Sequence, residues 1–138
     1  MEKLLGVDLG DARTGLAVSD ALGFMASPAG TIYSTYIVET ARKVADAARE
    51  HGARKIVLGL PVNMNGTEGP RAEKVKEFAE LLKKELEDCE IVFFDERCST
   101  MAAHQILNMT DTRGKKRREV IDTLSAQIIL QNYMDSHK

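Results

Sequence analysis

Three short apolar runs near the start of the chain predict three strands. Residues 3–9 (KLLGVDL) form an apolar run that meets Gly10, and residues 14–19 (TGLAVS) and 29–34 (AGTIYS) follow closely. Runs of this length, bounded by turn residues, are typical of strands. The connections between them are too short for helical crossovers, so the three strands should pair as an antiparallel meander.

Helical spacing of apolar positions begins at residue 37, and from there helices alternate with strands. Val38, Ala41, Ala45 and Ala48 share one helical face, and Gly52 ends that helix. The strand over 90–95 (EIVFFD) has apolar residues at both parities, which predicts burial on both of its faces. The elements expected after residue 36 are a helix over 37–51, a strand over 55–60, a loop over 61–70, a helix over 71–87, a strand over 90–95, a short helix from Ser99 or Thr100 to about Asn108, a loop over 110–117 and a last helix over 118–134.

This order predicts an α/β fold in which a mixed five-stranded sheet carries helices on both faces. The 138 residues fit a single domain spanning 1–138, with 43% hydrophobic and 29% charged residues. No apolar run approaches the ~18 residues of a membrane helix, so we expect no membrane partner. Asp8 interrupts the short N-terminal apolar run, so we expect this run not to be a signal peptide. Two cysteines, Cys89 and Cys98, match neither a disulfide scaffold nor a zinc site, so we expect reduced thiols and a cytoplasmic protein.

The charge is distributed unevenly along the chain. The net charge is −2, yet the segment 97–118 holds six basic residues against one acid. That segment carries +5, so the rest of the chain carries −7. A concentrated basic segment on an acidic protein can be a phosphate-contacting patch, although charge alone favours a solvated loop.

Four acidic residues stand where their positions need an explanation. Asp8 lies within an apolar strand, where an unpaired carboxylate is costly to bury. Asp95 and Glu96 end the strand over 90–95, and alternation allows only one of them to reach a given site. Asp122 is expected in the first turn of the last helix, where the helix dipole favours a carboxylate. Without any catalytic role, hydrogen bonds to turn amides would account for Asp8, solvation for Asp95 and Glu96, and the helix dipole for Asp122.

Taken together, acids on three separate elements near one sheet edge predict a cage of hard oxygen ligands. Such a cage suits Mg²⁺ or Mn²⁺ and is poor for zinc. Divalent ions held in this way stabilise the attacking and leaving oxygens of a phosphodiester. The basic segment runs directly into the helix that carries Asp122, which favours a nuclease.

Four ordered motifs then resemble one known family over about residues 5–133. They are GVDLGDARTGLAVSD (6–20), GLPVNMNGTEGPRA (59–72), FDERCST (94–100) and KKRREVIDTLSAQIILQ (115–131). The chain resembles the YqgF/RuvX family of pre-16S rRNA nucleases, which are related to Holliday-junction resolvases and have the RNase H-like fold. Two departures are Ser125, where the family usually has Ala, and Cys98, where a larger apolar residue is common.

The resemblance implies a role for each motif position. It assigns catalysis and metal binding to Asp8, Glu96 and Asp122, and leaves Asp95 as a neighbour with a weaker claim. It places Arg13 on the substrate side and makes the 59–72 segment a strand-handling loop. The substrate-binding candidates are Arg13, Asn65, Arg71, Arg97, Thr100, Lys115, Lys116, Arg117 and Arg118.

The implied function is metal-dependent hydrolysis of phosphodiester bonds in processing the 5′ end of pre-16S rRNA. Two alternatives remain: a Holliday-junction resolvase acting on four-way DNA, and a non-catalytic RNA-binding factor in ribosome assembly. Resolution of a two-fold junction normally uses a symmetric dimer, and we expect a monomer or weak homodimer. DLGDARTG also fits the D-x-G-x-x-x-x-G phosphate loop of sugar kinases and actin-like ATPases, but 138 residues supply only one of their two lobes.

Overall fold

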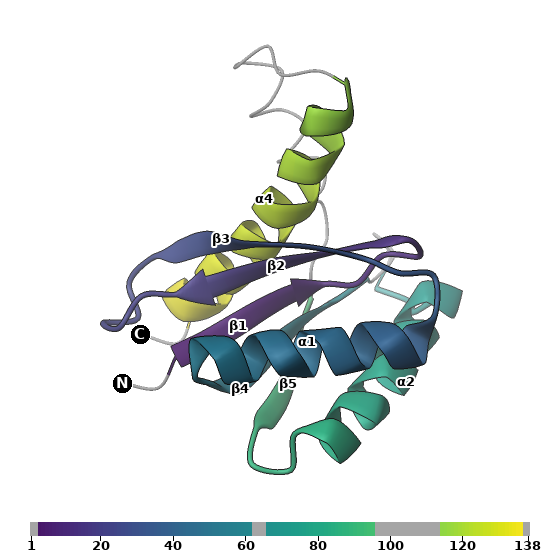
Figure 1. Cartoon of the computed structure of the whole chain (residues 1–138), viewed down its shortest axis with the longest axis horizontal. Coiled ribbons are helices and arrows are strands. Elements are labelled where there is room, and N and C mark those ends of the chain that lie inside the picture. The colour runs from purple at the N-terminus through teal and green to yellow at the C-terminus, as the bar shows by residue number, and fades with distance from the viewer. Residues whose placement is uncertain (1–2, 62–65, 96–113, 137–138) are drawn as a thin grey trace.

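The protein forms a mixed sheet with helices on both faces (Figure 1), in a computed structural model that describes residues 3–61, 66–95 and 114–136. Within these residues the sheet has five strands in the order β3-β2-β1-β4-β5. The strands are β1 (Lys3–Asp8), β2 (Arg13–Ser19), β3 (Ala26–Tyr33), β4 (Ala53–Leu60) and β5 (Glu90–Asp95). The helices are α1 (Ile37–His51), α2 (Pro70–Glu85) and α4 (Gly114–Ser136).

The register brings the C-terminal ends of three strands to one edge of the sheet. β1 runs parallel to β4, with Val7 beside Leu58, and β4 runs parallel to β5, with Leu60 beside Asp95. β2 pairs antiparallel with β1 and places Gly15 beside Asp8. Because ligands bind at the carboxyl ends of parallel strands in open α/β sheets, this edge is the first place to look for a site.

Two hydrophobic cores cover the two faces of the sheet. On one face Leu5, Val7 and Leu58 pack with residues of α1 and α2, including Phe78, and all of these side chains are buried. On the other face Val57 packs with residues of α4, including Leu130. Figure 1 shows α1 and α2 together on one side of the sheet and α4 on the other.

Glycines let α4 lie directly on the sheet. A Cβ on Gly15 would stand 1.9 Å from the carbonyl oxygen of Asp122, and a Cβ on Gly6 would stand 2.8 Å from Cβ of Leu130. Both approaches are closer than any side chain permits. The two glycines therefore fix how near α4 comes to β1 and β2.

Most predicted elements are confirmed, and three details need correction. α1 has the predicted bounds, whereas β3 begins three residues earlier than expected. The last helix begins at Gly114 and not at residue 118, because a run of Lys and Arg continues a helix readily once it has begun. β5 is not buried on both faces, since it is an edge strand, and Phe93 is 42% exposed.

The short helix expected between residue 99 or 100 and Asn108 lies outside the described residues. None of the helices in the described part of the chain combines the length and the apolarity needed to cross a membrane.

Candidate active site

Asp8 and Asp122 line the same cleft, although they come from opposite ends of the chain. Asp8 ends β1, and α4 brings Asp122 against Gly15, the register partner of Asp8. The cleft has a volume of about 520 Å³, and its wall also includes Arg13 and Arg71. Two of the three acids predicted to act together therefore meet in a cleft at the predicted sheet edge.

The surroundings of Asp8 disfavour its charge. Burial and, to a smaller extent, the negative charge of Asp122 together raise its pKa from the usual 3.8 to about 6, while Arg71 acts in the opposite direction. Alternation along β1 places Asp8 on the side of the sheet that α4 covers, together with Leu4 of the α4 core. A cation beside this carboxylate would relieve both the burial and the repulsion.

Asp122 is held by an ion pair that the sequence does not reveal. Nε of Arg13 donates a hydrogen bond to Oδ2 of Asp122 at 2.9 Å, and the Asp122 side chain is only 13% exposed. The two residues are 109 positions apart, so no local pattern signals their contact. Arg13 was predicted on the substrate side, and the structure places it in the cleft wall with its Nε on a candidate metal ligand.

The expected position of Asp122 in its helix is wrong. Because α4 begins at Gly114, Asp122 lies beyond the first turn, where the helix dipole has little effect. The dipole therefore does not explain this carboxylate. The Arg13 ion pair and the packing of α4 on Gly15 account for its position instead.

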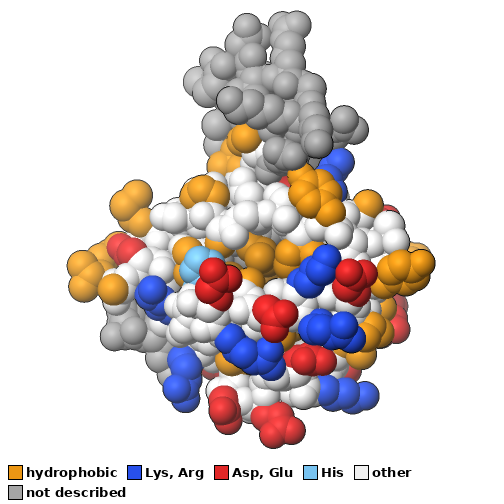
Figure 2. Space-filling model, in the orientation of Figure 1, with side chains coloured by type: hydrophobic (Ala, Val, Ile, Leu, Met, Phe, Trp, Pro, Cys, Tyr) orange, Lys and Arg blue, Asp and Glu red, His pale blue; other side chains and the backbone are white. Residues whose placement is uncertain are grey.

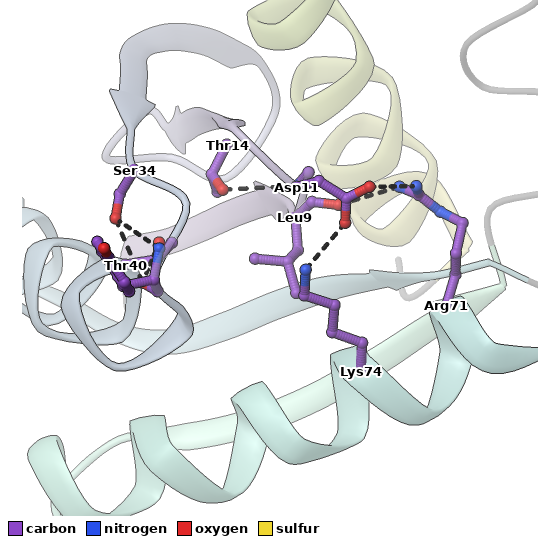
Figure 3. A network of polar contacts seen from close by, with 9 residues as sticks. Leu9, Asp11, Thr14, Ser34, Thr40, Arg71 and Lys74 are labelled. Carbon is purple, nitrogen blue, oxygen red and sulfur yellow. Dashed lines mark hydrogen bonds and ion pairs between the residues drawn. The ribbon is translucent and has the colours of Figure 1, made fainter.

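On the other side of the cleft, Asp11 joins two basic residues of α2 (Figure 3). Nζ of Lys74 donates to Oδ1 of Asp11 at 2.9 Å, and Nη1 of Arg71 lies 3.8 Å from Oδ2. The hydrogen bond from Lys74 lowers the pKa of Asp11 below its usual value. Arg71 was a predicted substrate-binding residue, whereas Lys74 was missed. No local signal marks Lys74, because its partner Asp11 lies 63 residues away in the chain.

The structure separates Asp95 from the face on which Asp8 lies. Val92 and Phe94 pack with the α4 core, so alternation turns Asp95 to the side that carries α1 and α2. Asp95 consequently does not share a face with Asp8. The other acid of this pair, Glu96, lies outside the described residues, as do Asn65, Arg97 and Thr100.

The basic residues Lys115 to Arg118 lie in the first turns of α4, in the same helix as Asp122. The expected loop over these positions is therefore helical from Gly114 onward. Figure 2 shows acidic and basic side chains interspersed over the face that α1 covers. A mixed surface of this kind is typical of a solvated face.

The donor set at the cleft fits a hard divalent cation. Asp8 and Asp122 offer carboxylate oxygens, the ligands that Mg²⁺ and Mn²⁺ prefer. In the described part of the chain these acids form no group of three potential ligands, and the third predicted donor, Glu96, lies outside that part. The mutual repulsion that raises the pKa of Asp8 is the repulsion that a shared cation removes.

Similarity to known proteins identifies the family of this chain. The family model described as "RuvX: Holliday junction resolvase" matches residues 2–136 of the chain. The chain belongs to the RuvX family. A relative from Clostridium tetani, named "Putative pre-16S rRNA nuclease", is 45% identical over 134 residues, which cover 97% of this chain and 96% of the relative. A relative from Rhodospirillum centenum has the same name and is 44% identical. The match covers 96% of this chain and 73% of the relative.

Solved structures place this RuvX-family chain in the fold of the RuvC-like resolvases. Thermus thermophilus RuvC, solved in complex with a Holliday junction substrate, has a TM-score of 0.59 at 11% identity and matches over 99% of this chain and 96% of RuvC. The fowlpox virus resolvase, solved with Holliday junction DNA, has a TM-score of 0.56 at 12% identity, with 98% of each chain covered. The predicted RNase H-like fold is confirmed. Membership in the RuvX family also places the chain in the class of nucleases.

Proposed function

We propose that this protein is a divalent-metal-dependent nuclease that processes the 5′ end of pre-16S rRNA during ribosome biogenesis. The observation that carries the proposal is the convergence of Asp8 and Asp122 in one cleft with Arg13 and Arg71 in its wall. Carboxylates beside fixed cations are what a site needs to hold metal and a phosphodiester together. The choice of pre-rRNA as substrate rests on the names of the curated relatives.

In this proposal Asp8, Asp122 and Glu96 are the catalytic and metal-binding residues. These carboxylates would hold Mg²⁺ or Mn²⁺, which would supply an acidified water molecule and a counter-charge for the departing oxygen. Arg13 fixes the direction of the Asp122 carboxylate through the 2.9 Å hydrogen bond. The assignment of Glu96 is supported by the family motif and by alternation along β5, which turns Asp95 away from the face of Asp8.

The remaining predicted residues serve the substrate. Arg71 borders the cleft that holds Asp8, so its guanidinium can bind a phosphate beside the scissile bond. Lys115, Lys116, Arg117 and Arg118 precede Asp122 on α4, and we assign them to phosphates farther along the strand. Arg13, Asn65, Arg97 and Thr100 complete the proposed substrate contacts. We place this activity in the cytoplasm, acting as a monomer or weak homodimer on nucleic acid.

The second candidate function is resolution of four-way DNA junctions. The description of the family model and the two junction-bound structural neighbours favour it. The same acids would perform the same hydrolysis on either substrate. A purely RNA-binding factor, by contrast, would have no need to hold Asp8 and Asp122 against their mutual repulsion.

A substrate comparison tests the proposal. The protein is incubated with a pre-16S rRNA fragment that includes its 5′ precursor sequence and with a four-way DNA junction, each in Mg²⁺, Mn²⁺ or EDTA. We expect cleavage of the RNA in Mg²⁺ or Mn²⁺ and none in EDTA. Cleavage confined to the junction would favour the resolvase, and binding without cleavage in any metal would favour the assembly factor.

A further inference from the structure

Asp11 links two cations that the cleft would otherwise offer to a substrate. It lies in the turn between β1 and β2, where its two carboxylate oxygens face Lys74 and Arg71 of α2 (Figure 3). The two basic residues are three positions apart, so they occupy one face of the helix. In the free protein, α2 therefore presents a cationic pair to which a carboxylate is already bound.

This cationic pair is continuous with the proposed active site. Arg71 lines the cleft of about 520 Å³ that contains Asp8, and its Nη2 donates to the carbonyl oxygen of Leu9 at 3.4 Å. Beside the cleft is a recess of about 10 Å³ lined in part by Asp11, Arg71 and Lys74. Such a volume holds about one water molecule and no phosphate group. A phosphate that bridges both cations at this recess would therefore take the place of the Asp11 carboxylate.

The exchange of Asp11 for a phosphate is energetically easy. The Asp11 side chain is 75% exposed, and ion pairs at such exposed positions contribute little to stability. A guanidinium and an ammonium group both bind phosphate strongly, and the two non-bridging oxygens of a phosphodiester can replace the two oxygens of the carboxylate. The Asp11 carboxylate, once displaced, can be solvated where it stands.

We propose that Asp11 is an intramolecular competitor for a phosphate group of the nucleic acid. Its carboxylate occupies Arg71 and Lys74 in the free protein, and a substrate phosphate displaces it on binding. This inference rests on the proposed nucleic-acid function and adds two roles to it. Lys74 becomes a substrate-binding residue, and Asp11 becomes a residue that limits affinity.

The experiment measures binding of a fluorescent single-stranded RNA by anisotropy over a range of salt concentrations. Every protein carries Asp8→Asn and is kept in Mg²⁺, so that cleavage does not obscure binding. We expect Asp11→Asn to tighten binding about two- to five-fold, the factor associated with releasing an exposed ion pair. The slope of log affinity against log salt should steepen by up to about 0.7. Lys74→Gln should weaken binding by a similar factor.

Two comparisons separate displacement from a general effect of charge. Asp46→Asn removes one negative charge and breaks another exposed ion pair, that with Arg49 at 3.1 Å on α1, and should leave binding unchanged. Asp11→Asn should give no gain when Arg71→Gln and Lys74→Gln are also present.

Three results would overturn the inference: no gain from Asp11→Asn, an equal gain from Asp46→Asn, or an undiminished gain without the two cations. If the Asp8→Asn protein itself binds no RNA, the proposed nucleic-acid function fails along with the inference. RNA binding with no effect of Asp11 removes the inference alone.

Discussion

Replacing Asp8 with asparagine should stabilise the metal-free protein, because the folded state disfavours the charge of this carboxylate. Burial and the charge of Asp122 raise the pKa of Asp8 from 3.8 to about 6, whereas in the unfolded chain the pKa returns to its ordinary value. At pH 7.5 folding must therefore hold an ionised group in a place that favours the neutral one. Asparagine has nearly the same shape and carries no charge.

The magnitude follows from the shift in the pKa of Asp8. A difference of about two units corresponds to about 3 kcal/mol in the free energy of unfolding. For a domain of this size that gain raises the Tm by roughly 10 °C. Since the folded-state pKa is the raised one, the penalty on the wild type is complete above pH 6 and disappears as the pH falls toward 4. The difference between the two proteins should shrink over the same interval.

The assay is urea denaturation of both proteins in EDTA at pH 7.5 and again near pH 4. Asp11→Asn is the matched control. The hydrogen bond from Lys74 lowers the pKa of Asp11, so removing the charge of this carboxylate should give no stabilisation at pH 7.5. Adding Mg²⁺ should narrow the gap at pH 7.5, since only the wild type keeps both carboxylate donors. If Asp8→Asn is instead less stable than the wild type at pH 7.5, Asp8 serves the turn that follows it and the account of the cleft is wrong.

Three further changes probe the packing and the substrate surface. Gly15→Ala should cost about 1–3 kcal/mol or more and lower activity, because its Cβ would stand 1.9 Å from the carbonyl oxygen of Asp122; unchanged melting would show that α4 is not seated on this glycine. Ser125→Ala should raise stability by about 1 kcal/mol in urea denaturation, because Ser125 Oγ is buried without a hydrogen-bond partner among the described residues; a loss of stability would reveal a partner elsewhere in the chain. Lys115→Gln combined with Lys116→Gln should weaken binding to unrelated RNA sequences and leave the rate at saturating substrate unchanged. The slope of log affinity against log salt should flatten by between one and two times the roughly 0.7 expected for each phosphate contact of a single strand. An unchanged slope would mean that these residues are only solvated.

Local patterns in the sequence were sufficient for the elements whose apolar spacing is regular. The helix over 37–51 has its predicted bounds because one apolar face repeats throughout it and Gly52 ends it. The start of α4 was misplaced because its first residues are all polar or basic and carry no apolar period. Burial of β5 was overestimated because the run EIVFFD does not reveal that the strand lies at an edge.

Contacts between residues far apart in the sequence are the part of the site that the sequence could not predict. The sequence selected Asp8 and Asp122, since each is an acid beside apolar positions, but it gave no sign that Arg13 pairs with Asp122 across 109 residues. Strand alternation alone could not choose between Asp95 and Glu96, because that choice depends on which face of the sheet α4 covers. Lys74 was overlooked because its partner Asp11 lies in a turn whose position relative to α2 depends on the whole fold.

The most direct test of the central claim is the rate of RNA cleavage at saturating substrate in Mg²⁺. It is measured for the wild type, Asp8→Asn and Asp95→Asn, after each variant is shown to be folded. If Asp8 holds the metal and Asp95 faces the opposite side of the sheet, Asp8→Asn abolishes cleavage while Asp95→Asn keeps a rate within a few-fold of the wild type. Full activity in Asp8→Asn would contradict the account.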